Sequence, residues 1–105
     1  MTSKKDLMAE NLLNGETISN YREGGNSMKP IIKHRQPVTI SPIKLEDVKI
    51  GDVVFCKVSG KYWSHEVHAI DPIKGLQIGN HKGHINGWTK TVFGRITEVD
   101  GKTLK

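Results

Sequence analysis

The sequence predicts a mainly β fold: a bent antiparallel sheet or partial barrel with one short N-terminal helix. Three observations predict it. Eleven glycines in 105 residues indicate many turns and short strands rather than a helical bundle. Short apolar runs separated by turn signals follow one another from residue 37 onward, which favours closely spaced antiparallel strands. Helical spacing of apolar residues occurs near the N-terminus.

Length and composition indicate one domain. A chain of 105 residues can bury one modest core, and we divide it into an N-terminal helix with its linker at 1–24 and a β domain at 25–105. No apolar stretch approaches the length of about 18–20 residues that a membrane helix needs. The single cysteine, Cys56, excludes an intrachain disulfide. We therefore expect a soluble cytoplasmic protein without a cofactor, a metal or a membrane partner.

The charge pattern is mildly basic. The net charge is +5, from 16 Lys and Arg against 11 Asp and Glu. The basic residues are dispersed, and only Lys4-Lys5 forms an adjacent pair. This pattern is typical of a solvated surface with a positive bias, so we do not expect a nucleic-acid partner.

The first expected element is a helix. Residues 4–13, KKDLMAENLL, place Met8 and Leu12 four positions apart and predict a short amphipathic helix. Asn14-Gly15 is a typical helix end. The polar stretch 15–26 predicts a loop.

From residue 37 the apolar pattern becomes that of strands. The predicted strands are 38–40, 53–58, 62–70, 76–78 and 91–99. Ser59-Gly60 is typical of a two-residue hairpin turn, Asp71-Pro72 ends the following strand, and Asp100-Gly101 forms a last turn. The stretches 45–52 and 79–90 predict a turn-rich connection and a loop rich in Gly, Asn and His.

One short segment carries a candidate nucleophile: Gly-Asn-Ser-Met-Lys-Pro at 25–30. Asn-Ser beside glycine is common turn chemistry, so Ser27 is either a turn residue or a nucleophile. A serine becomes nucleophilic when a base lies within hydrogen-bond reach. Lys29 occupies the place of the second glycine in G-x-S-x-G, which excludes the nucleophile elbow of the α/β hydrolases.

The strand predicted at 62–70 carries two histidines on opposite faces. Alternation places His65 with Trp63 and Val67, and places His68 on the more polar face. A histidine in apolar surroundings tends to stay neutral, and neutral imidazole can accept a serine proton. A hydrogen-bonded core histidine is the structural alternative for His65.

Together these segments resemble the serine-peptidase superfamily of signal peptidase I and the LexA-like self-cleaving SOS repressors. The resemblance rests on Ser-Met-Lys-Pro at 27–30, Gly-Asp-Val-Val at 51–54 and the closing segment Val-Phe-Gly-Arg-Ile at 92–96. It covers roughly residues 24–99.

Within that superfamily the chain resembles the histidine type. Bacterial signal peptidases and SOS repressors use a lysine base, whereas the archaeal and endoplasmic-reticulum signal peptidases use a histidine. The return strand here reads Ser-His-Glu-Val at 64–67, with no lysine between Lys61 and Lys74. His65 occupies the base position, and His68 is the alternative because Val-His could be aligned there instead.

The resemblance implies a serine endopeptidase that performs acyl transfer on a polypeptide substrate. Ser27 would be the nucleophile and His65 the base of a Ser/His dyad. The amides of Ser27 and Met28 would donate to the oxyanion, and Gly25 and Pro30 would hold Ser27 in place. Without an anchor or a DNA-binding domain, the chain resembles the minimal soluble versions that phages encode.

The chain departs from the family at the group that orients the base. The family carries an acid in a Lys-Gly-Asp stretch near the last strand, but here Lys82-Gly83 is followed by His84. Either the dyad lacks its carboxylate, or another group such as Asp100 or a carbonyl takes that role.

The sequence also allows two functions other than a peptidase. His65, His68, His81 and His84 form two similarly spaced pairs that could bind zinc, although positions three apart on a strand point to opposite faces. A catalytically weak or inactive module could also keep the fold and bind peptides at an exposed sheet edge.

Overall fold

Within the described residues, 2–25 and 28–104, the computed structural model contains one α-helix, one 3-10 helix and eight strands. In chain order they are α1 (Lys4–Leu13), β1 (Ile18–Arg22), β2 (Pro37–Pro42), η1 (Leu45–Asp47), β3 (Val53–Val58), β4 (Lys61–Asp71), β5 (Gly75–Gly79), β6 (Ile85–Thr89), β7 (Val92–Val99) and β8 (Lys102–Thr103). The predictions at 4–13 and 53–58 match α1 and β3. The other four predicted strands match β2, β4, β5 and β7 to within two residues at each end.

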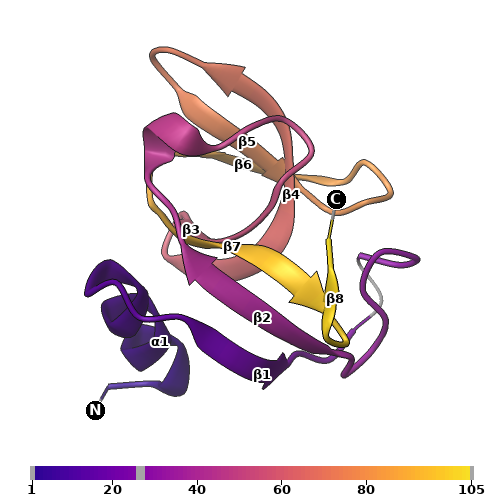
Figure 1. Cartoon of the computed structure of the whole chain (residues 1–105). Helices are drawn as coiled ribbons and strands as arrows, with labels where there is room; N and C mark the ends of the chain where they lie inside the picture. Colours follow the sequence, from indigo (N-terminus) through magenta and orange to yellow (C-terminus); the bar gives the residue numbers. More distant parts are fainter. Residues whose placement is uncertain (1, 26–27, 105) are drawn as a thin grey trace.

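The strands form one antiparallel sheet in the order β1-β2-β7-β3-β4-β5-β6, with β8 paired to β7. Figure 1 shows β1 and β2 beside α1 at one end of this sheet, with β5 and β6 at the other. Over the described part of the chain, β1 and β6 are not paired, so the bent sheet does not close into a barrel. The predicted mainly β class with a short N-terminal helix is confirmed.

Local sequence explains the central hairpin. Ser59 and Gly60 both have positive φ, 49° and 82°, as a two-residue type I′ turn requires. The turn sets the register of β3 against β4, in which Val54 pairs with His65 and Val53 with Glu66. The position of His65 in the sheet therefore follows from a turn that the sequence predicts.

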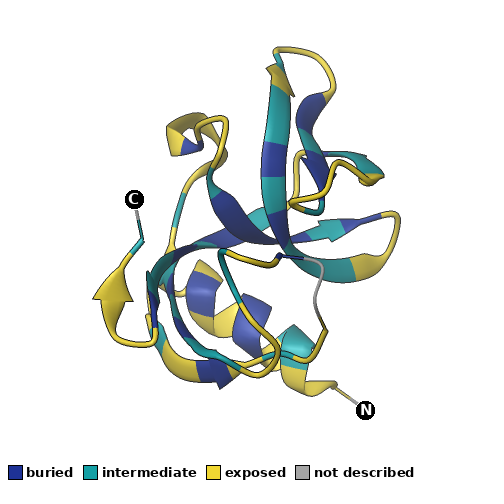
Figure 2. Cartoon of the chain, turned by 90° about the vertical axis from the view of Figure 1, so that its right-hand side faces the viewer, coloured by how far each residue is buried: buried dark blue, intermediate teal, exposed yellow. Residues whose placement is uncertain are grey.

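β3 lies at the centre of the core because both of its faces are buried. Val53 and Phe55 belong to a cluster with α1 and β2, whereas Val54, Cys56 and Val58 belong to a second cluster with β4 and β5. Side chains alternate across a strand, so this near-continuous apolar run buries both faces. Figure 2 shows buried segments on the inner strands and on one side of the helix.

α1 covers one face of the sheet. The Ser3 hydroxyl accepts from the Asp6 amide at 3.1 Å, and the Asp6 carboxylate accepts from the Ser3 amide at 3.2 Å, which forms a capping box. Asp6 also accepts a hydrogen bond from the Tyr62 hydroxyl on β4. α1 has 10 residues, and the described chain contains no helix of the length and apolarity that crossing a membrane requires.

Leu12→Ala is expected to destabilise the protein by about 2–5 kcal/mol. The Leu12 side chain is 2% exposed and packs in the cluster beneath α1, so its truncation leaves a cavity as well as losing buried apolar area. Leu13→Ala is the matched control because Leu13 is 69% exposed. Urea unfolding followed by circular dichroism measures both changes, and similar losses in the two variants would contradict the observed docking of α1.

Two predicted loops contain strands. β1 lies within 15–26 and β6 lies within 79–90, so both loop predictions were wrong over those residues. Each strand has one buried residue, Tyr21 in β1 and Thr89 in β6, so neither shows apolar alternation. They form because neighbouring strands supply hydrogen-bond partners, β2 for β1 and β5 for β6.

The described residues before Gly25 share one core with the described residues that follow. β1 pairs with β2 in the main sheet, and α1 contributes Met8, Ala9 and Leu12 to the cluster that contains Phe55. The N-terminal segment, expected to be a helix and a linker, is thus an integral layer of the fold.

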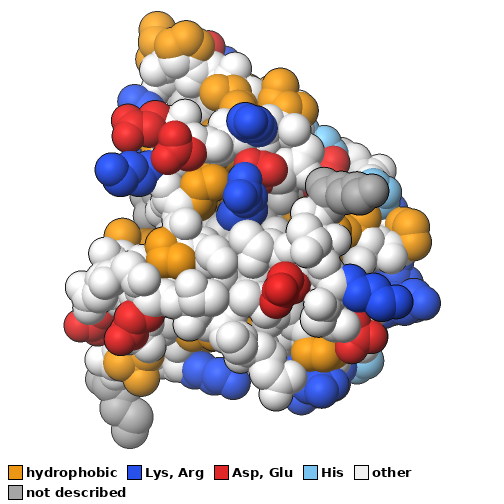
Figure 3. Space-filling view, in the orientation of Figure 1, with side chains coloured by type: hydrophobic (Ala, Val, Ile, Leu, Met, Phe, Trp, Pro, Cys, Tyr) orange, Lys and Arg blue, Asp and Glu red, His pale blue; other side chains and the backbone are white. Residues whose placement is uncertain are grey.

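Charged side chains are dispersed over the face seen in Figure 3, where basic side chains lie among acidic ones. Lys5 forms an ion pair with Glu23 at 3.5 Å, and Arg95 approaches Asp52 at 3.8 Å. Such partly exposed pairs contribute little to stability. The Lys5–Glu23 pair nevertheless fixes one carboxylate oxygen of Glu23, the residue that directly follows β1.

Candidate active site

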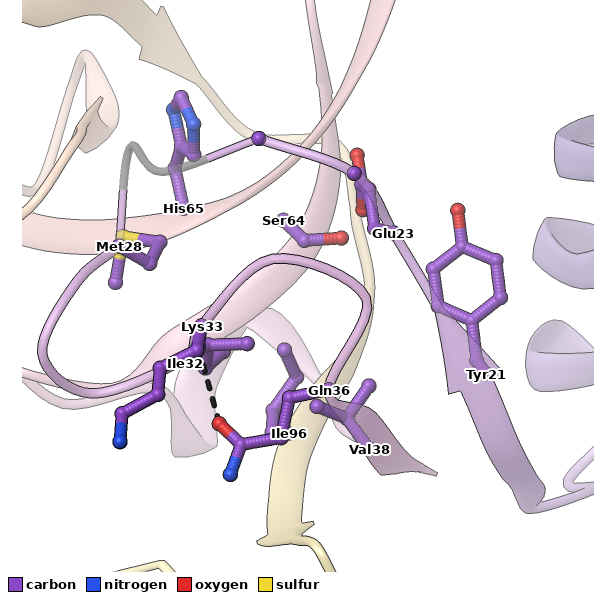
Figure 4. Close-up of a pocket in the computed structure, with 12 residues that line it drawn as sticks. Tyr21, Glu23, Met28, Ile32, Lys33, Gln36, Val38, Ser64, His65 and Ile96 are labelled. Atoms are coloured by element: carbon purple, nitrogen blue, oxygen red, sulfur yellow. Dashed lines mark hydrogen bonds between the residues drawn. The ribbon is translucent and has the colours of Figure 1, made fainter.

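A small pocket opens where the chain after β1 and the chain before β2 meet β4 (Figure 4). Its cavity volume is about 50 Å³, which leaves room for a short side chain or a few water molecules. Gly25 and Met28 both line it, as do Ser64 and His65 from β4. The pocket therefore brings a predicted base together with the residues on either side of 26–27.

The predicted nucleophile Ser27 lies outside the described residues, which end at Gly25 and resume at Met28. Gly25 has a φ of 108°, a conformation that favours glycine, and its amide donates to His34 Nδ1 at 2.8 Å. Met28 is buried in the core cluster, and Pro30 follows in the turn at 28–31. Both ends of the segment that carries Ser27 are thus anchored beside the pocket.

His65 is buried and oriented. Its side chain is 6% exposed, and its ring lies 4.8 Å from that of Trp63, as the predicted sharing of a face requires. Nδ1 lies 2.7 Å from Asn86 Oδ1. An amide oxygen accepts hydrogen bonds, so Nδ1 carries the proton and Nε2 is the nitrogen that can act as a base.

The environment keeps this imidazole neutral. Burial lowers the pKa of His65 below its ordinary value of 6.5, and the hydrogen bond to Asn86 and the charge of Glu23 offset only part of that effect. At neutral pH the ring is therefore unprotonated, which is the form that a general base needs.

Asn86 is a candidate site residue that the sequence did not indicate. It lies on β6, whereas the considered alternative Asp100 lies in the turn between β7 and β8. β6 also packs against β3, three places away in strand order, so the sheet curls and brings Asn86 over β4. The available signal was its position soon after Lys82-Gly83, where the family carries its acid, but Asn-Gly at 86–87 is also ordinary turn chemistry.

The other histidines have different surroundings. His68, the alternative base, has Nε2 2.8 Å from the backbone carbonyl of Asn80. His81 Nδ1 lies 2.8 Å from Glu66 Oε1. In the part of the chain that the structure describes, no three His, Cys, Asp or Glu side chains gather as metal ligands, so the zinc hypothesis has no assembled ligand set there.

No protein-family model matches this chain, and no curated protein or solved structure shows significant similarity to it. The peptidase resemblance therefore rests on the segments at 27–30, 51–54 and 92–96 and on the surroundings of His65. These surroundings place the neutral imidazole of His65, in a defined tautomer, at the wall of a small pocket.

Proposed function

We propose that the protein is a serine endopeptidase in which Ser27 is the nucleophile, His65 the general base and Asn86 the group that orients the base. The observation that carries the proposal is that His65, whose Nδ1 lies 2.7 Å from Asn86 Oδ1, lines one pocket with Gly25 and Met28, the residues on either side of 26–27. A hydrogen-bonded core histidine needs neither a pocket nor these two neighbours.

The proposed reaction is acyl transfer in two steps. Ser27 Oγ forms a bond to the carbonyl carbon of the substrate while His65 Nε2 takes the hydroxyl proton. The carbon–nitrogen bond then breaks, and the imidazolium returns that proton to the leaving amine. A water molecule, deprotonated by the same imidazole, then attacks the acyl carbon. The ester bond between that carbon and Ser27 Oγ breaks, and the imidazolium returns the proton to Oγ.

The surrounding residues support this sequence of steps. The Asn86 amide oxygen holds the Nδ1 proton, which fixes the tautomer and favours the charged ring that forms in the transition state. Unlike a carboxylate, it adds no full negative charge, so we expect a slower enzyme than one with an acid at this place. The Met28 amide, with that of Ser27, is the proposed donor to the oxyanion.

A fluorophosphonate probe tests the nucleophile. We expect the wild-type protein to be labelled once, at Ser27, and the Ser27→Ala variant to lose all labelling, because the probe reacts with an activated serine hydroxyl. Ser41→Ala is the matched control, since Ser41 lies on β2 and bonds to the Thr97 hydroxyl. Mass spectrometry of the intact protein and its peptides locates the adduct. Labelling that survives in Ser27→Ala contradicts the assignment.

The alternative hypothesis is a peptide-binding module without catalysis. It predicts that peptides bind at the pocket while the wild-type protein neither reacts with the probe nor cleaves them. The labelling experiment therefore separates the two functions, because both would use the same surface.

A further inference from the structure

Two buried polar atoms in the pocket wall lack partners among the described residues: Glu23 Oε2 and Ser64 Oγ. Both residues line the pocket beside His65. A buried polar atom without a hydrogen bond destabilises the folded protein, so native proteins satisfy nearly all of them. Two such atoms in one pocket indicate a group that binds there and completes their hydrogen bonds.

Two neighbouring side chains, Lys5 and Tyr21, hold the Glu23 carboxylate in place. Its Oε1 pairs with Lys5 Nζ at 3.5 Å. The Tyr21 hydroxyl interacts with the same carboxyl group. Burial and, to a smaller extent, this interaction with Glu23 raise the pKa of Tyr21 to about 12. These contacts leave Oε2 as the oxygen that is buried without a partner in the described chain. In Figure 4 the Ser64 hydroxyl points toward the Glu23 side chain.

We infer that this pocket selects substrates with a hydroxyl-bearing side chain, serine or threonine, next to the scissile bond. The substrate hydroxyl would donate to Glu23 Oε2 and accept from the Ser64 hydroxyl, so both orphan atoms gain a partner. The inference rests on the proposed peptidase function and adds its substrate class.

The chemistry of the two atoms favours a hydroxyl over other groups. A methyl or isopropyl side chain would fill the space and leave both atoms unpaired. An ammonium group can only donate, so it could not accept a hydrogen bond from the Ser64 hydroxyl, and a lysine side chain is long for a cavity of about 50 Å³. Threonine and valine are nearly equal in size, so they isolate the contribution of the hydroxyl.

The test measures cleavage of matched peptides. A peptide library digested by the wild-type protein, with Ser27→Ala as the blank, identifies cleaved bonds, and the residue beside the bond is then set to threonine or valine. We expect kcat/KM for the threonine peptide to be at least about tenfold higher, because a site built for a hydroxyl rejects the analogue that lacks it. In Ser64→Ala and Glu23→Met this ratio should fall toward one, and in the control Ser41→Ala it should persist.

A second measurement separates this inference from the proposed function. N-acetyl-threonine N-methylamide and its valine counterpart are titrated into the full-length protein, and amide NMR signals of Glu23 and Ser64 report binding without catalysis. Tighter binding of the threonine compound, with no peptide cleaved, would keep the hydroxyl site and reject the peptidase. Equal affinities, or cleavage with equal rates for threonine and valine, would overturn the hydroxyl site even if the peptidase assignment stands.

Discussion

Ser27→Ala, His65→Gln and the double variant are expected to lose the same factor in kcat, about a thousandfold or more. Nucleophile and base act as one unit: without the base the hydroxyl keeps its proton, and without the hydroxyl the base has no proton to take. Removing the second group should therefore cost little once the first is gone. Peptide cleavage assayed at several substrate concentrations gives kcat for the three variants.

His68→Gln is the matched control for this series. His68 lies three residues further along β4 and contacts a backbone carbonyl of Asn80, so its replacement tests the alternative base. We expect His68→Gln to keep nearly all of kcat, and circular dichroism to show that the His65→Gln variant remains folded. Losses that multiply in the double variant, or a larger loss at His68 than at His65, would rule out the proposed dyad.

The second large effect is expected at Asn86. Asn86→Leu keeps the size of the side chain but removes the acceptor of the His65 Nδ1 proton. The ring is then no longer fixed in the tautomer with the proton on Nδ1, which should lower kcat about a hundredfold or more. Asn86→Asp restores the carboxylate of related triads and should raise kcat about tenfold, because a negative charge stabilises the imidazolium in the transition state. The same cleavage assay compares the two variants with the wild type.

The pH dependence of kcat/KM distinguishes a role of Asn86 in orienting the base from a purely structural role. Burial lowers the pKa of His65, so the acid limb of kcat/KM should have its midpoint below pH 6.5 in the wild type. A carboxylate at position 86 raises the pKa of His65, so in Asn86→Asp this limb should move to higher pH. An unchanged limb would mean that Asn86 does not act through the imidazole.

The same shift predicts how stability varies with pH. His65 is neutral in the folded protein and titrates near its ordinary value in the unfolded chain, so its contribution is complete above pH 6.5. As the pH falls below that value, the unfolded chain binds the proton first, and stability declines toward the lower folded pKa. Acidification is therefore expected to reduce the stability of the protein, and the responsible group, His65, is also the base of the proposed mechanism.

Local sequence was sufficient for the elements with strong patterns. The run at 53–58 predicts β3 because a strand buried on both faces is apolar throughout, and Ser59-Gly60 predicts the hairpin through its backbone conformation. Helical spacing and an Asn-Gly end predict α1. β1 and β6 were not predicted because each has only one buried residue, so their hydrogen-bonding partners, and not their side-chain patterns, make them strands.

In the candidate site, some features follow from local sequence and others depend on tertiary contacts. The sequence by itself determined a mainly β domain, the motif around Ser27 and the placement of His65 on an apolar face, because alternation and turn chemistry act over a few neighbouring residues. The tertiary structure alone decided that Asn86 meets His65 and that Glu23 and Ser64 border one pocket. These contacts join residues 21 or more positions apart, and only the curling of the sheet brings such distant segments within hydrogen-bond reach.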